Sequence, residues 1–202
     1  MIIIGLTGIL GSGKSTVAAL LRKRGREVID LDALARDSLN WKETQDDIKR
    51  AFGPEYVIDG TVDVKKLRGI AFTKEHLRTL EAIIHPRVIQ ETRRRLDALE
   101  KKGTPAVFID HPLLFETGFY RRLDKIVVVT AAMDTIRERL KKRGMDPDDI
   151  ERRLSFQLSL KVKEKMADYL IDNNGTENRL EEQVDGLLEK ITKGEVPEDV
   201  PE

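Results

Sequence analysis

Eight residues near the N-terminus have the spacing of a phosphate-binding loop. The segment from Gly8 to Ser15 reads GILGSGKS and matches the pattern G-x-x-x-x-G-K-[ST]. An apolar run over 2–6 precedes it, and apolar residues at helical spacing follow it. Glycines let successive backbone N–H groups point at an anion, and a helix N-terminus adds positive potential. The sequence therefore predicts a nucleoside triphosphate site.

The side chains of this loop have separate expected roles. We expect Lys14 to reach the β- and γ-phosphates, and Ser15 to bind Mg²⁺ through its hydroxyl group. The other loop residues that we expect to surround the phosphates are Gly8, Gly11, Ser12, Gly13 and Thr16.

Three aspartates stand where strands are expected to end. Asp30 and Asp32 follow a short strand over 27–30, and alternation along a strand would place both carboxylates on one side. We expect Asp30 to hold Mg²⁺ through water, and Asp32 to orient a substrate hydroxyl for attack. Asp110 ends an apolar run and is expected as a second acidic group near the metal. Helix capping after residue 30 and strand-end solvation at Asp110 are the structural alternatives.

A helical stretch over about 132–160 carries several arginines. Arg139 and Arg143 are spaced i, i+4 and would share one face of a helix. Arginines on a mobile helix can neutralise the charge that develops on a transferring phosphoryl group. We expect these two to be catalytic, and a solvated charged face is the alternative.

The elements that must position these residues alternate between strands and helices. Apolar runs predict strands over 2–6, 27–30, 106–110, 126–129 and 169–171. Helical patterns separate them, which predicts an α/β fold with a parallel sheet of about five strands. Residues 41–102 show helical periodicity and turns but no convincing buried strand, and predict a helical insertion. Further helices are expected to begin at Asp146-Pro147 and to run over 176–191.

Composition narrows the class of protein. The 202 residues include 36 basic and 36 acidic side chains, and this balance argues against a nucleic-acid or membrane-surface partner. There is no cysteine, which excludes disulfides and thiolate chemistry and fits a reducing cytoplasm. No apolar run approaches the ~20 residues that span a bilayer. A cytoplasmic protein is expected.

Together these segments resemble the dephospho-CoA kinase family over about residues 3–188. The likeness is carried by GLTG and GSGKSTVA at the start, VIDLD with Ala35-Arg36, Ile84-His85-Pro86, DHPLLFE over 110–116 and IDNNG over 171–175. The resemblance implies a three-layer P-loop kinase fold with a helical substrate-binding insertion and a helical lid. It implies transfer of the ATP γ-phosphate to the ribose 3′-hydroxyl of dephospho-CoA, with Mg²⁺.

The resemblance also implies roles and boundaries. Asp32 would be the base, and Arg139 and Arg143 would belong to the lid. The dephospho-CoA side would be lined by Thr7, Asp32, Arg36, His85, Pro112, Leu113 and Leu114, while Asn173 and Gly175 would lie near the adenine of ATP. The nucleotide-binding core would comprise 1–40 and 103–192 with the lid over about 132–160, the insertion 41–102, and an acidic tail 193–202. The alternatives are purely structural roles: a helix boundary at His85-Pro86, core packing at 112–114 and an ordinary turn at 173–175.

Three departures from the family pattern and two rival functions remain. Ile9 and Leu10 stand where the family usually has glycine then isoleucine. Val64 follows Asp63 where an arginine is common, and Ile136 stands where the family usually has glutamine. One rival is another small-molecule P-loop kinase of the shikimate or nucleotide type, which His85-Pro86 and the 112–114 turn argue against. The other is a regulatory NTP-binding switch, although the N-K-x-D segment of a guanine-specific switch is absent.

Overall fold

The computed structural model describes residues 1–70 and 73–193. Apart from Lys193, the acidic tail expected over 193–202 lies outside the described residues. Two compact units are present: residues 1–28 with 105–202, and residues 29–104. The second unit thus begins before the insertion expected over 41–102, because the helix that follows residue 30 packs against the long helix of the same unit.

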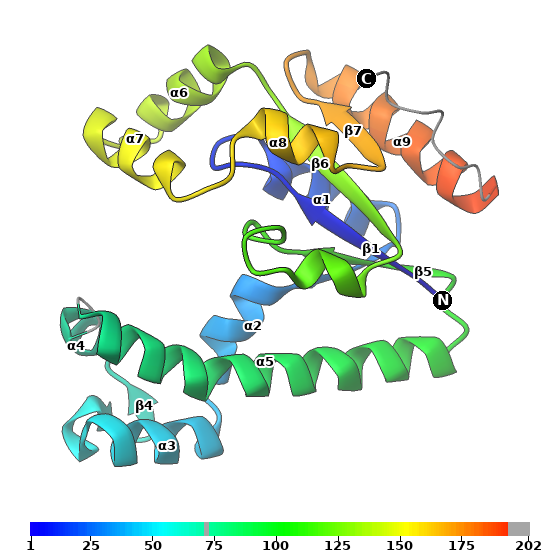
Figure 1. The fold of residues 1–202 in the computed structure, drawn as a ribbon. Coiled ribbons are helices and arrows are strands. Elements are labelled where there is room, and N and C mark those ends of the chain that lie inside the picture. The colour runs from blue at the N-terminus through cyan, green and yellow to red at the C-terminus, as the bar shows by residue number, and fades with distance from the viewer. Residues whose placement is uncertain (71–72, 194–202) are drawn as a thin grey trace. The chain divides into compact units, whose positions relative to one another are not determined.

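A five-stranded sheet has four of its strands in the first unit, and the fifth, β2, contains the point in the chain at which the first unit gives way to the second (Figure 1). Its strands, in the order β2-β5-β1-β6-β7, are Glu27–Asp30, Ala106–Asp110, Ile2–Thr7, Lys125–Thr130 and Tyr169–Asp172. β1 pairs in parallel with β5 and with β6, and β6 pairs in parallel with β7. All five expected strands are present, and the expected α/β fold class is confirmed.

Helices cover both faces of this sheet, so the strands are apolar on both sides. Val127 and Val129 pack with α1 (Lys14–Lys23) and α9 (Glu177–Lys193). Ile126 and Val128 point the other way and pack with the turn after β5 and with α8 (Leu160–Lys165). Side chains that alternate along one strand therefore bind the two outer layers to the middle one.

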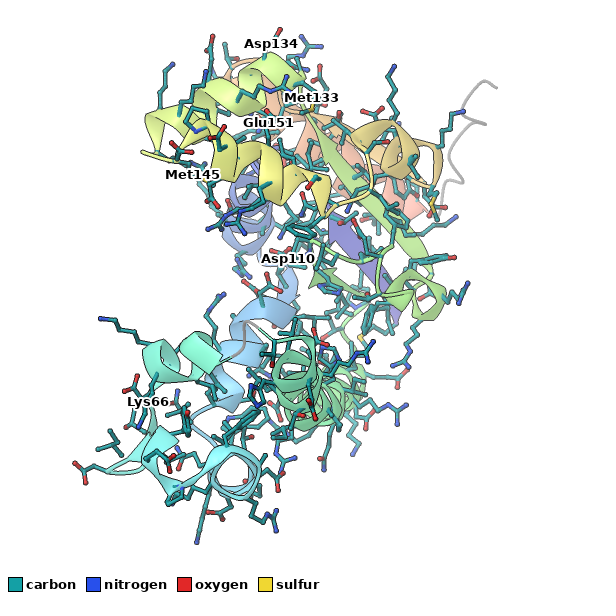
Figure 2. All side chains as sticks on the ribbon, turned by 60° about the vertical axis from the view of Figure 1, so that its left-hand side comes forward. Lys66, Asp110, Met133, Asp134, Met145 and Glu151 are labelled. Atoms are coloured by element: carbon teal, nitrogen blue, oxygen red, sulfur yellow. The ribbon has the colours of Figure 1, made fainter. Side chains whose placement is uncertain are left out.

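Two helices, α6 (Met133–Lys142) and α7 (Pro147–Ser155), form the segment expected as a lid. Asp146 caps α7 by accepting a hydrogen bond from the N–H of Asp148 at 2.9 Å, so the expected helix start is confirmed. Arg137 donates to Glu151 at 2.7 Å and joins the two helices. Figure 2 labels Glu151 in α7, and Met133 and Asp134 where α6 begins.

The second unit is mainly helical. Its elements are α2 (Leu31–Ser38), α3 (Lys42–Phe52), a 3₁₀ turn η1 (Pro54–Tyr56), β3 (Val57–Ile58), β4 (Thr61–Val62), α4 (Val64–Ile70) and α5 (Lys74–Lys101). The antiparallel hairpin β3–β4 was missed in the sequence. Asp59 and Gly60 both have positive φ, at 48° and 70°, which is the geometry of a two-residue hairpin turn. Val57 and Val62 are buried in the small core of this unit.

The long helix α5 runs through Pro86 without a break. The interpretation of His85-Pro86 as a helix boundary is therefore wrong. Pro86 cannot donate to the carbonyl four residues earlier, but packing of α5 against α2 and α3 supports the helix across this point. Although α5 has 28 residues, it carries many charges, and none of the helices over 1–70 and 73–193 is long and apolar enough to cross a membrane.

Candidate active site

The phosphate-binding loop needs glycine at two positions for steric reasons. Gly13 is the N-cap of α1 with φ at 95°, where a side chain would be strained. A Cβ on Gly13 would also lie 1.9 Å from Nδ2 of Asn173. At Gly8, a Cβ would lie 2.7 Å from the carbonyl oxygen of Val129. The loop can therefore pass this close to β6 and to the end of β7 only without side chains.

Residues from the C-terminal half of the chain hold the loop in place. The N–H of Leu10 donates to Oε1 of Gln157 at 2.9 Å, and Nδ2 of Asn173 donates to the Ser12 carbonyl at 2.8 Å. Arg139 in turn donates to the Asn173 carbonyl at 2.8 Å. Sequence reasoning missed Gln157, because nothing in its own surroundings marks a partner 147 residues away.

Lys14 lies at the carboxyl end of the sheet and forms an ion pair with Asp110. The parallel register of β1 and β5 sets Leu6 opposite Asp110, so the loop that follows β1 begins beside the end of β5. Asp110, labelled in Figure 2, is 5% exposed, and the alternative of strand-end solvation is wrong. An ammonium and a carboxylate held together here form a charged pair that incoming phosphates can rearrange.

Ser15 and Thr16 are exposed in the first turn of α1. Among the described residues, no group of three or more acidic or histidine side chains could enclose a metal ion. Mg²⁺ is usually held by one or two protein oxygens together with water and substrate phosphates. The exposed Ser15 hydroxyl and the Asp110 carboxylate fit that kind of site.

The turn after β5 is fixed by a buried polar network. The Pro112 carbonyl accepts hydrogen bonds from Oγ1 of Thr7 at 3.2 Å and from Nζ of Lys163 at 2.9 Å. Lys163 also pairs with Glu116 at 2.9 Å. Burial lowers the pKa of Lys163 below its ordinary value, while Glu116 opposes this and nearby Lys14 adds to it. Burial alone would raise the pKa of Glu116, but hydrogen bonds from Lys163 and from the Leu158 N–H hold it below its usual range.

The side chains of this turn point in different directions. Leu114 is fully buried in the core that contains Phe115 and Val128, which matches the alternative of core packing. Leu113 is exposed. Of the two leucines expected near dephospho-CoA, only Leu113 presents its side chain to solvent, and Thr7 is itself buried.

The two expected lid arginines differ in their surroundings. Arg139 is partly buried beside the loop, with NH2 on the Asn173 carbonyl and NH1 buried without a partner. NH1 lies 3.9 Å from the position of a Cβ on Gly13. Arg143 is exposed just after the end of α6. Because α6 ends at Lys142, Arg143 caps the helix and is not part of it. The expected pair of arginines on one helical face is therefore only partly present.

Asn173 and Gly175 belong to the turn after β7. Asn173 is buried, and its N–H donates to the Thr130 carbonyl at 2.8 Å. A Cβ on Gly175 would lie 2.9 Å from Cδ of Arg179. Asn173 therefore supports the loop at Ser12, and a contact with adenine stays a prediction.

The remaining expected site residues belong to the second unit. Asp30 caps α2 by accepting a hydrogen bond from the Ala33 N–H at 2.8 Å. Asp32 is exposed in the first turn of α2, so the expected alternation of Asp30 and Asp32 along one strand is wrong. The physical reason is that the capping bond starts the helix at Leu31 and ends the strand.

Arg36 lines an apolar hollow of the same unit, and His85 follows one of the lining residues along the chain. The hollow has a volume of about 210 Å³ and is lined by Ala35, Arg36, Leu39, Val64, Leu67, Leu80 and Ile84. His85 is exposed on α5, directly after Ile84. An apolar hollow with one arginine in its wall suits a ligand that combines an aliphatic part with an anionic group.

Comparisons with known proteins identify the family. A family model described as dephospho-CoA kinase matches residues 2–179. The chain belongs to the dephospho-CoA kinase family. The dephospho-CoA kinase of Corynebacterium efficiens is 41% identical over 195 residues, which cover 95% of this chain and 98% of that protein.

Solved structures show the same fold. A crystal structure from Thermus thermophilus has a TM-score of 0.80 at 38% identity and covers 94% of this chain and 97% of its own. The dephospho-CoA kinase of Campylobacter jejuni has a TM-score of 0.73 at 24% identity over 95% of this chain and 98% of its own, and shows the shared fold. As a dephospho-CoA kinase family member, the chain is a phosphotransferase that uses ATP and acts on a hydroxyl group of dephospho-CoA.

Proposed function

We propose that this protein transfers the γ-phosphoryl group of ATP to the ribose 3′-hydroxyl of dephospho-CoA, giving coenzyme A and ADP. The observation that carries the proposal is the Lys14–Asp110 pair beside a sterically constrained phosphate-binding loop, in a chain of this family. In the reaction the hydroxyl oxygen forms a bond to the γ-phosphorus and the bond to the β–γ bridging oxygen breaks. The hydroxyl proton passes to Asp32.

The residues around the loop divide the remaining work. Lys14 and the loop N–H groups neutralise the β- and γ-phosphates, together with the free NH1 of Arg139. The Asp110 carboxylate gives up its contact with Lys14 as the phosphates enter. Dephospho-CoA is contacted by three exposed side chains, those of Arg36, His85 and Leu113.

The proposal includes Mg²⁺, which Ser15 and Asp110 would hold together with the phosphates, and which Asp30 would hold through water. When bound, the ion would neutralise charge on the β- and γ-phosphates. We expect chelation of divalent cations with EDTA to abolish ADP release, and excess Mg²⁺ to restore it. ADP release that persists in EDTA would refute this part of the proposal.

The proposal also covers partners and location. It includes no nucleic-acid or membrane partner, supported by a formal net charge of zero. It places the protein in the cytoplasm, supported by the lack of cysteine. The division into a nucleotide-binding core with a lid over 132–160 and a substrate-binding insertion over 41–102 is part of the same proposal.

A coupled ADP-release assay with dephospho-CoA, shikimate, adenosine and AMP as acceptors tests the reaction. Dephospho-CoA alone should stimulate ADP release. Stimulation by shikimate or AMP instead would favour the second candidate, a small-molecule kinase of the shikimate or nucleotide type.

Asp32→Asn tests the assigned base. We expect kcat to fall by about 10²–10⁴-fold, because proton transfer by a positioned side chain contributes that much. Asp37→Asn is the matched control, since Asp37 is an exposed aspartate in the same helix. Full turnover in Asp32→Asn, or an equal loss in Asp37→Asn, would show that Asp32 is not the base.

A further inference from the structure

Lys163 in α8 is a buried cation that the proposed mechanism does not use. Its side chain is 0% exposed, so it cannot touch a substrate. Its ammonium donates to the Pro112 carbonyl at 2.9 Å and pairs with Oε1 of Glu116 at 2.9 Å. A buried ammonium group is stable only when hydrogen-bond and charge partners replace the water that it has lost. The turn after β5 supplies these partners, and the same contacts fix the position of the turn.

The Pro112 carbonyl is a junction between three elements. Thr7 at the end of β1 donates to it, and so does Lys163 from α8, while Pro112 itself follows β5. Four residues later, Glu116 accepts the Leu158 N–H at 2.8 Å as well as the Lys163 ammonium. Lys163 therefore holds the turn over 111–116 at both ends.

We propose that Lys163 is a positioning residue for the phosphoryl acceptor, which sets the turn over 111–116 so that Leu113 faces dephospho-CoA. The inference rests on the proposed function, which assigns this turn to the dephospho-CoA side. Lys163 acts through the Pro112 carbonyl and Glu116, and the exposed Leu113 lies between these two points.

The phosphate-binding loop is held in place by residues other than Lys163. The inference therefore predicts different effects on the binding of dephospho-CoA and of ATP. Gln157 holds the loop at Leu10, and Asn173 holds it at Ser12. Neither contact involves Lys163. Loss of Lys163 should therefore disturb the acceptor and leave ATP binding almost intact.

The test is Lys163→Met, which keeps the length of the side chain and removes its charge and its donors. We expect KM for dephospho-CoA to rise about tenfold or more, since misplacing a positioning group by about 1 Å can cost up to about 10²-fold. KM for ATP should stay within about twofold of wild type. Steady-state ADP release with each co-substrate varied in turn measures both values.

Lys125→Met is the matched control. Lys125 pairs with Asp168 at 3.1 Å, and Asp168 also accepts the Ile126 N–H at 2.8 Å, as Glu116 accepts that of Leu158. This pair lies at the amino end of β6, away from the turn over 111–116. The control variant should lose stability without a change in either KM.

A second variant keeps the test decisive if Lys163→Met does not fold. In Lys163→Met with Glu116→Gln no partly buried carboxylate is left unpaired, and the amide oxygen at position 116 still accepts the Leu158 N–H. The Pro112 carbonyl still lacks its donor, so the rise in KM for dephospho-CoA should persist although stability recovers.

Two results would overturn the inference: unchanged KM values in a folded variant, or an equal rise in KM for both co-substrates. Either would make Lys163 a purely structural residue. Wild-type turnover of dephospho-CoA is measured in the same assay. If the wild type fails to use dephospho-CoA, the proposed function is wrong, which is a different result from an unshifted KM in an active variant.

Discussion

Gly13→Ala should destabilise the protein through two separable effects. The first is backbone strain, because φ at Gly13 is 95° and an L-residue in the left-handed region costs roughly 1–2 kcal/mol. The second is a collision, because the new Cβ would lie 1.9 Å from Nδ2 of Asn173. Asn173 would have to turn away and leave the Ser12 carbonyl without its donor, which costs about 1–3 kcal/mol. The free energy of unfolding should therefore fall by about 2–5 kcal/mol.

A double-mutant cycle separates these effects. Asn173→Ala alone removes the hydrogen bond to the Ser12 carbonyl. In the double variant Gly13→Ala with Asn173→Ala this bond is already absent, so the collision adds no further loss. The double variant should thus be more stable than the sum of the single changes indicates, by about 1–3 kcal/mol. Urea titration followed by far-UV circular dichroism measures the four unfolding free energies without any nucleotide.

Gly25→Ala is the control for strain alone. Gly25 also has positive φ, at 71°, but nothing lies within 4 Å of the position of its Cβ. It should cost roughly 1–2 kcal/mol and show no coupling to Asn173→Ala. Additive effects of Gly13→Ala and Asn173→Ala, within about 0.5 kcal/mol, would refute the collision and with it the account of how Asn173 supports the loop.

Two further predictions concern charge. Arg139→Ala should lower kcat by about 10²-fold or more and Arg143→Ala by much less. The reason is that, of these two arginines, only Arg139 has a buried, unpaired NH1 beside the loop. Equal losses of kcat would contradict this distinction between the two arginines. Hydrogen bonds from Arg94 and then Arg95 hold the pKa of Glu91 at about 2, against an ordinary 4.5, so its contribution to stability is complete above pH 4.5 and is lost as pH falls toward 2. Because both arginines are exposed, Glu91→Gln should remove only about 1 kcal/mol at neutral pH and flatten the dependence of unfolding free energy on pH between 4.5 and 2; an unchanged slope would contradict this.

The strands and the phosphate-binding loop could be predicted because their signals are local. A parallel strand covered on both faces is apolar along its whole length, and Gly8 to Ser15 carry their chemistry within one segment. The hairpin of β3 and β4 escaped notice because strands of two residues are too short to show alternation. Only the Asp59-Gly60 turn marked it.

Side chains that act across long separations in sequence could not be predicted in this way. Gln157 reaches Leu10, and Lys163 reaches Pro112 over 51 residues, and each lies in an ordinary polar segment. The strand alternation expected for Asp30 and Asp32 failed for the opposite reason, since its signal was local but ambiguous. An aspartate at the end of a strand can continue the alternation or cap a helix, and at Asp30 capping prevailed.

Ile9 and Ile136, two of the positions where the resemblance implies departures from the family, lie in one apolar cluster. The described residues contain one non-glycine residue with positive φ, Asp59, so the backbone at Ile9 is one that any L-residue adopts, and the loop does not need glycine there. Ile9 is 5% exposed and Ile136 is fully buried, and both belong to one apolar cluster with Leu140 of α6. An apolar side chain in the loop requires an apolar partner on α6, where a glutamine would bury an amide group without an evident hydrogen bond. Ile9 and Ile136 therefore belong to one packing unit, which ties α6 to the phosphate-binding loop.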